Sequence, residues 1–131
     1  MYNIIICTIF TLILKMISKQ EVEIYLKELK VKMKIFGILF LDDRGKNQQT
    51  LLDLEISPAK RNEIINSLEV EDYLQGPLDE KMHGLLPMWV FGRNVKEKEV
   101  YIKVSKGIEN NRAVCISFHI AEHKMNYPFK K

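Results

Sequence analysis

The sequence predicts an α+β fold in which a small antiparallel β-sheet carries N-terminal helices packed on one face. In the C-terminal part, residues 88–93, 99–105 and 112–119 have the length and alternation of strands, and residues 107–111 form a turn between the last two. In the N-terminal part, helix-start signals precede apolar residues at helical spacing. A chain of 131 residues has room for one core, so we expect one domain over residues 18–131, preceded by an apolar leader over residues 1–17.

The leader is strongly apolar between Ile4 and Leu14. Eleven residues are too few for a helix that crosses a bilayer, which needs about 20. A signal peptide fits poorly, because no basic residue precedes the apolar run and no small-x-small site follows it. Either translation starts at Met16 or the leader is a peripheral membrane segment. Both alternatives stay open for the leader, and we expect a protein without a membrane partner.

The first predicted helix begins at Ser18, which forms a capping box with Glu21 three residues later. Its core-facing side is a stripe of apolar residues at helical spacing: Val22, Tyr25, Leu26, Leu29 and Met33.

Shorter elements follow. Residues Ile35–Leu41 are predicted as a strand and Asp42–Gly45 as a turn. Asn47 is expected to cap a helix that ends at Leu54, and Ser57-Pro58 to start a third helix that runs to Leu68. Residues 69–84 are polar and contain Gly76-Pro77, so we expect a loop there.

The predicted hairpin separates apolar from polar side chains. If its strands pair in an even register, Val100, Ile102 and Val104 share one face with Val114, Ile116 and Phe118. The opposite face then carries polar side chains on a rigid support: Tyr101, Lys103, Ser105, Cys115, Ser117 and His119. We therefore expect any catalytic site to lie on this second face.

Charge is distributed unevenly. The net charge is only +3, but residues 1–80 contain 10 basic and 13 acidic residues, whereas residues 81–131 contain 10 basic and 4 acidic residues. A polyanion such as RNA would therefore approach the part that contains the hairpin, although such a bias also suits an ordinary solvated surface.

The two cysteines, Cys7 and Cys115, are isolated and lack CxxC spacing. This pattern favours a reduced, cytoplasmic protein over a disulfide scaffold or a cysteine zinc site.

Residues 119–123 match H-x-x-E-H, a zinc-protease motif that needs its two histidines on one helix face. Here the motif directly follows a predicted strand, and Pro128 ends the segment soon afterwards. We therefore interpret the match as coincidence and expect neither a metal nor a cofactor.

A second interpretation is a metal-free site that cleaves RNA. RNA carries its own nucleophile, the 2′-hydroxyl, so a protein needs only proton-transfer groups and a group that holds the phosphate. His119 is the candidate base or acid, Lys103 the phosphate ligand, and Tyr101 a hydrogen-bond donor or stacking partner. All three also suit an ordinary exposed sheet face.

Further RNA contacts are predicted outside the hairpin face. Arg93 and Arg112 are candidate phosphate ligands. Trp89 lies on the same side of its strand as Arg93, a pattern that suits either a core residue or an aromatic that grips a base.

The order of these elements resembles the MqsR toxins of bacterial type II toxin–antitoxin systems, over about Ser18 to His123. The best-marked segments are Val100-Tyr101-Ile102-Lys103 and Cys115-Ile116-Ser117-Phe118, together with Met88-Trp89 and Glu71-Asp72-Tyr73. The resemblance implies a RelE-like fold, metal-independent cleavage of messenger RNA in the cytoplasm, and a partner antitoxin with a zinc-binding domain.

The family's active-site residues carry over in part. Tyr101 stands at the position of a family tyrosine, and His119 replaces a lysine that follows the last strand. A family glutamine after the tryptophan falls on Val90, and a family loop lysine falls near Gln75, which is therefore a candidate RNA contact. The alternative function, from a different class, is a non-catalytic module that binds RNA or protein with the same basic face.

Overall fold

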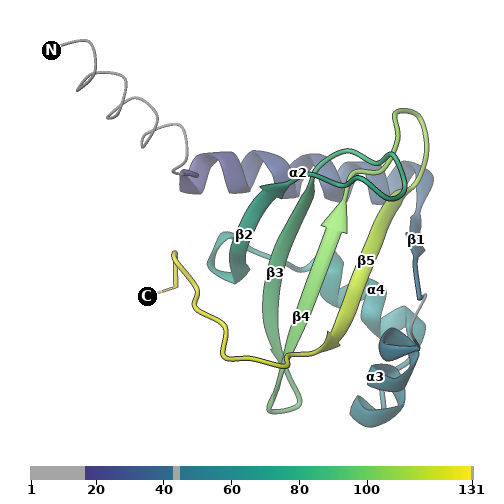
Figure 1. Ribbon diagram of the computed structural model, residues 1–131, viewed down its shortest axis with the longest axis vertical. Helices are drawn as coiled ribbons and strands as arrows, with labels where there is room; N and C mark the ends of the chain where they lie inside the picture. The colour runs from purple at the N-terminus through teal and green to yellow at the C-terminus, as the bar shows by residue number, and fades with distance from the viewer. Residues whose placement is uncertain (1–16, 43–44, 131) are drawn as a thin grey trace, which may run out of the picture.

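The computed structural model describes residues 17–42 and 45–130 (Figure 1). Over these residues it shows an α+β fold with three α-helices and a five-stranded mixed sheet. No helix in the described part of the chain is long and apolar enough to cross a membrane. The predicted leader, except Ile17, and two residues of the predicted turn, 43 and 44, lie outside the described residues. The elements are α2 (Lys19–Phe36), β1 (Ile38–Phe40), α3 (Lys46–Leu54), α4 (Pro58–Asn66), a 3-10 turn (Val70–Asp72), β2 (Tyr73–Leu78), β3 (Met88–Val95), β4 (Lys98–Ser105) and β5 (Ala113–Ile120).

The strand order in the sheet is β1-β5-β4-β3-β2. Strands β3, β4 and β5 pair antiparallel, as predicted, and β2 pairs antiparallel with β3. Strand β1 pairs parallel to β5, so the sheet is mixed. The predicted strand over Ile35–Leu41 is also too long, because α2 continues to Phe36 and Gly37 ends it at φ 84°. Glycine adopts this left-handed conformation without steric cost.

Helix α2 supplies much of the core, and its predicted start and stripe are confirmed. The Ser18 hydroxyl accepts a hydrogen bond from the Glu21 N–H at 3.2 Å. The side of α2 that faces the sheet buries Val22, Tyr25, Leu26, Leu29 and Met33. Tyr25 stacks on Trp89 of β3 with 4.3 Å between ring centroids. The core therefore lies between α2, α4 and one face of the sheet.

A bulge in β5 changes the predicted hairpin faces. Tyr101 pairs with His119 and Lys103 with Ser117, but Val104 pairs with Cys115, so Ile116 is an extra residue. Before the bulge, Cys115 faces the core and is fully buried, whereas the prediction placed it on the polar face. Ser105 is also buried. The predicted polar face is thus correct for Tyr101, Lys103, Ser117 and His119 and wrong for Cys115, whereas Ser105 keeps its side of β4 but is covered and donates to the Leu86 carbonyl.

The short strand β1 pairs with only the first part of β5. Helix α3 supplies hydrogen-bond acceptors to the remaining part of that edge. The Asn47 Oδ1 accepts from the Phe118 N–H at 2.9 Å, and the Thr50 hydroxyl accepts from the Ile120 N–H at 3.3 Å. The prediction that Asn47 caps this helix is wrong, because Gly45 is the N-cap residue and Asn47 lies buried inside the first turn. Its side chain replaces a neighbouring strand, which local sequence cannot show.

Replacing Asn47 by alanine is expected to lower the free energy of unfolding by about 2–3 kcal/mol. The substitution leaves the buried Phe118 N–H without an acceptor and the Leu41 carbonyl without the Asn47 amide donor. Urea unfolding of the two proteins measures this difference. Gln48→Ala, at the exposed next position, is the control and should stay within about 0.5 kcal/mol of the wild type. Equal effects of both substitutions would contradict the role assigned to Asn47.

The predicted loop over residues 69–84 is partly ordered structure. It contains the 3-10 turn and β2, an edge strand that pairs with β3 through two register shifts. Gly76-Pro77 indicated a turn, but an edge strand tolerates proline because the missing N–H faces away from the sheet. In the remaining loop, the Glu80 carboxylate accepts hydrogen bonds from the N–H groups of Leu85, His83 and Met82, which lower the pKa of Glu80 to about 2.

Candidate RNA-cleaving site

The candidate site lies on the sheet face that α2 and α4 do not cover, which we call the open face. Tyr101 on β4 and His119 on β5 are direct cross-strand partners there, and their rings stack with centroids 5.2 Å apart at 18°. The next row along the same face pairs Lys103 with Ser117. The two strands therefore bring together the three residues that the sequence predicted as catalytic.

The imidazole of His119 has a defined orientation. Its Nδ1 lies 3.0 Å from the carbonyl oxygen of Ile120. A carbonyl oxygen only accepts, so this contact requires a proton on Nδ1 and leaves Nε2 of the neutral ring as the basic nitrogen. Nε2 makes no hydrogen bond with any other described residue, and it is free to take a proton from a bound molecule.

Lys103 and Tyr101 have unused hydrogen-bonding capacity beside this nitrogen. The Lys103 ammonium lies 5.8 Å from the Tyr101 ring centroid and has no ion-pair partner within the described ranges. Partial burial raises the pKa of Tyr101, so its hydroxyl stays protonated and can donate at neutral pH. A cation without an ion-pair partner and a free hydrogen-bond donor, both next to a base, are groups that can bind a phosphodiester.

Of two other predicted RNA contacts, Gln75 lies near this cluster and Arg112 lies far from it. Gln75 on β2 is exposed and shares the row of Val90 and Lys103, which places it roughly 10 Å from Lys103 at ordinary strand spacing. Arg112 is exposed just before β5, seven residues and roughly 20 Å from His119. Arg112 could therefore reach only a neighbouring nucleotide.

Arg93 lies on the opposite side of the sheet. It is the cross-strand partner of the core residue Val100, and its guanidinium forms an ion pair with Asp72 at 2.7 Å. It also donates to the hydroxyl and the carbonyl of Ser67. The hydrogen bond to Asp72 raises the pKa of Arg93. These contacts hold the turn before β2 in place and separate Arg93 from the open face.

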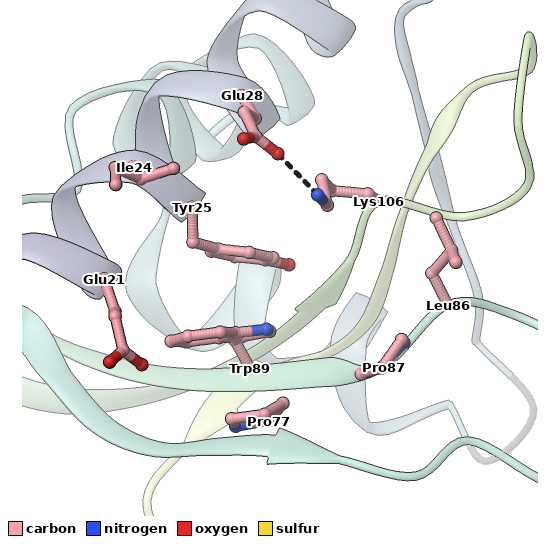
Figure 2. Close-up of a pocket in the computed structure, with 9 residues that line it drawn as sticks. All are labelled: Glu21, Ile24, Tyr25, Glu28, Pro77, Leu86, Pro87, Trp89 and Lys106. Carbon is pink, nitrogen blue, oxygen red and sulfur yellow. Dashed lines mark hydrogen bonds and ion pairs between the residues drawn. The ribbon is translucent and has the colours of Figure 1, made fainter. Parts of the chain in front are cut away.

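Trp89 is also on the helix-covered side. It lies at the bottom of a cleft of about 370 Å³, with its ring between Tyr25 and Pro77 (Figure 2). Glu21 and Glu28 line the same cleft, and Lys106 is paired with Glu28 at 2.6 Å. Because the Trp89 ring is buried and already stacked on Tyr25, the predicted stacking of a base on Trp89 has no support from this arrangement.

The H-x-x-E-H match does not form a helical pair of histidines. His119 is in β5, and residues 121–130 contain no helix. Glu122 forms an ion pair with Lys46 of α3 at 2.5 Å. Within residues 17–42 and 45–130, no group of three histidine, cysteine or carboxylate side chains could hold a metal ion.

No role at the open face was predicted for the C-terminal segment 121–130, which runs past the lower ends of β4 and β3 (Figure 1). Gly92, the β3 partner of Tyr101, leaves room for Met125 and Tyr127, and the Tyr127 hydroxyl donates to Glu99. A Cβ at Gly92 would lie 2.5 Å from the Tyr127 hydroxyl oxygen. A glycine inside a strand is the signal that could have revealed this close approach. The segment bounds the site on the side of Tyr101 away from His119.

Comparisons of the chain with protein-family models, with curated proteins and with solved structures give no match.

Proposed function

We propose that this protein is a metal-independent endoribonuclease that cleaves single-stranded RNA on its open face. One observation carries the proposal. The Nε2 of His119, the ammonium of Lys103 and the hydroxyl of Tyr101 lie in adjacent positions on β4 and β5, and none has a hydrogen bond or ion pair with another described residue. A rigid sheet that presents a base, a cation and a donor meets the needs of RNA cleavage through the 2′-hydroxyl.

In this reaction His119 Nε2 takes the proton of the 2′-hydroxyl, whose oxygen attacks the adjacent phosphorus. The bond from phosphorus to the 5′ oxygen breaks, and that oxygen takes up a proton from solvent. The products are a 2′,3′-cyclic phosphate and a 5′-hydroxyl. Lys103 stabilises the charge on the phosphate oxygens, and Tyr101 orients the RNA by a hydrogen bond.

We further propose the biological setting that the MqsR resemblance implies, a toxin of a type II toxin–antitoxin system that acts on messenger RNA in the cytoplasm. The resemblance at the site is limited to Tyr101 and to a proton-transfer group at His119. The partner would be an antitoxin with its own zinc-binding domain. Arg93 is left out of the catalytic roles, since Asp72 and Ser67 already bind its guanidinium.

The test is cleavage of a labelled single-stranded RNA by the full chain in excess EDTA. We expect cutting that leaves a 2′,3′-cyclic phosphate and that stops when the nucleotide before the cut carries a 2′-deoxyribose. Cutting that needs an added divalent metal, or that persists at the deoxyribose, would contradict the mechanism. Salt-sensitive RNA binding without any cutting would favour the non-catalytic binding module instead.

A further inference from the structure

A cleft of about 420 Å³ lies on the side of His119 away from Tyr101, between β5 and α3. Its lining includes His119 and Ile120 from β5, Lys46, Gln49 and Thr50 from α3, and Glu122. It is a shallow depression that is open to solvent. The cleft exists because α3, rather than another strand, covers this part of the β5 edge through Thr50.

The charges in this cleft compensate one another. Lys46 is paired with Glu122, and the hydrogen bond from Lys46 lowers the pKa of Glu122, so the carboxylate stays ionised. The other polar side chain with capacity to spare, Gln49, is neutral. A phosphate would gain little electrostatic stabilisation in this cleft. It would gain more at Lys103, on the other side of the site, which has no ion-pair partner among the described residues. The cleft thus suits a neutral, hydrogen-bonding group.

Gln49 is the residue that can select among such groups. Its Nε2 donates to Asp53 at 2.9 Å, which fixes the orientation of the amide. The carbonyl oxygen and the second N–H of Gln49 remain without partners among the described residues. By contrast, the Thr50 hydroxyl donates its one proton to the Lys46 carbonyl and accepts from the Ile120 N–H, and the side chain is buried, so it has no donor for a ligand. An amide with one acceptor and one donor matches the edge of a nucleobase.

We infer that this cleft binds the nucleobase next to the cleaved phosphodiester, and that Gln49 determines which base is accepted. The inference rests on the proposed function, because His119 is shared by the cleft and the candidate site. With the phosphate at Lys103 and the 2′-hydroxyl at His119, the adjacent base enters between β5 and α3. Cleavage is then selective for the base at one position beside the cut.

The test compares cleavage rates on four single-stranded RNAs that differ only at one nucleotide beside the mapped cut. We expect the wild type to prefer one base. In Gln49→Leu the ratio of the cleavage rates on the best and the poorest RNA should fall about tenfold, while this variant still cuts the poor substrates. Gln49→Glu, which replaces both N–H donors by an acceptor and removes the hydrogen bond to Asp53, should abolish the wild-type preference. Gln48→Leu is the matched control: this exposed glutamine on the same helix does not line the cleft, and the preference should be unchanged.

The outcomes separate the inference from the proposed function. An unchanged preference in Gln49→Leu and Gln49→Glu would overturn the inference and leave the cleavage mechanism intact. A wild type that cuts with no preference at any position beside the cut would do the same. A folded wild type that never cuts RNA would overturn both. Both glutamines are exposed, so the variants should unfold within a few degrees of the wild type.

Discussion

Replacing His119 by alanine is expected to lower the rate of RNA cleavage in EDTA by a factor of about 10² to 10⁴. The variant lacks the imidazole nitrogen that lies beside Tyr101 and has no hydrogen bond with another described residue. The stacked pair with Tyr101 is also lost, but such a pair contributes only about 0.5–1.5 kcal/mol, so the variant should remain folded. Single-turnover cleavage of a labelled RNA, beside a thermal unfolding curve, separates the two effects.

His123→Ala is the matched control for this prediction. His123 is exposed in the segment after β5 and lines no part of the candidate site. We expect it to cleave RNA at the wild-type rate. If His119→Ala cuts normally, the open face is not the catalytic site. If instead the wild type cuts only with added zinc and both variants lose that activity, the zinc-site interpretation of residues 119–123 gains support.

Replacing Phe118 by alanine is expected to lower the free energy of unfolding by about 3–5 kcal/mol. Phe118 is the neighbour of His119 on β5, but it points to the other face, pairs with Ile102 and is fully buried in the core. Its removal leaves a cavity that the surrounding strands fill only in part. Because domains are stable by about 5–15 kcal/mol, this one substitution removes a large fraction of the total.

Urea unfolding measures this loss as a lower midpoint with an unchanged slope. His119→Ala, one residue along the strand, should cost about 1.5 kcal/mol at most. A small loss at Phe118, or equal losses at the two positions, would contradict the assignment of faces on β5. The pair of variants therefore tests the alternation that supports both the core and the candidate site.

The features that could be read from the sequence depend on residues close together in the chain. Ser18 and Ser57 start helices because each hydroxyl accepts an N–H three residues later. Side chains alternate between the two faces along β4 and along the part of β5 after the bulge, because a strand has a period of two residues. This alternation placed Tyr101, Lys103 and His119 on one face. From these signals, the two helix starts and the shared face of the three side chains are predicted correctly.

The remaining features depend on contacts between distant segments. The bulge at Ile116, the parallel pairing of β1 and the role of Asn47 at the β5 edge each satisfy hydrogen bonds that exist only after the sheet has formed. The same holds for the C-terminal segment over Gly92 and for the position of Gln49 beside His119. Periodicity specifies which face of an element is apolar, but the choice of partner depends on the packing of the whole chain, which no local pattern contains.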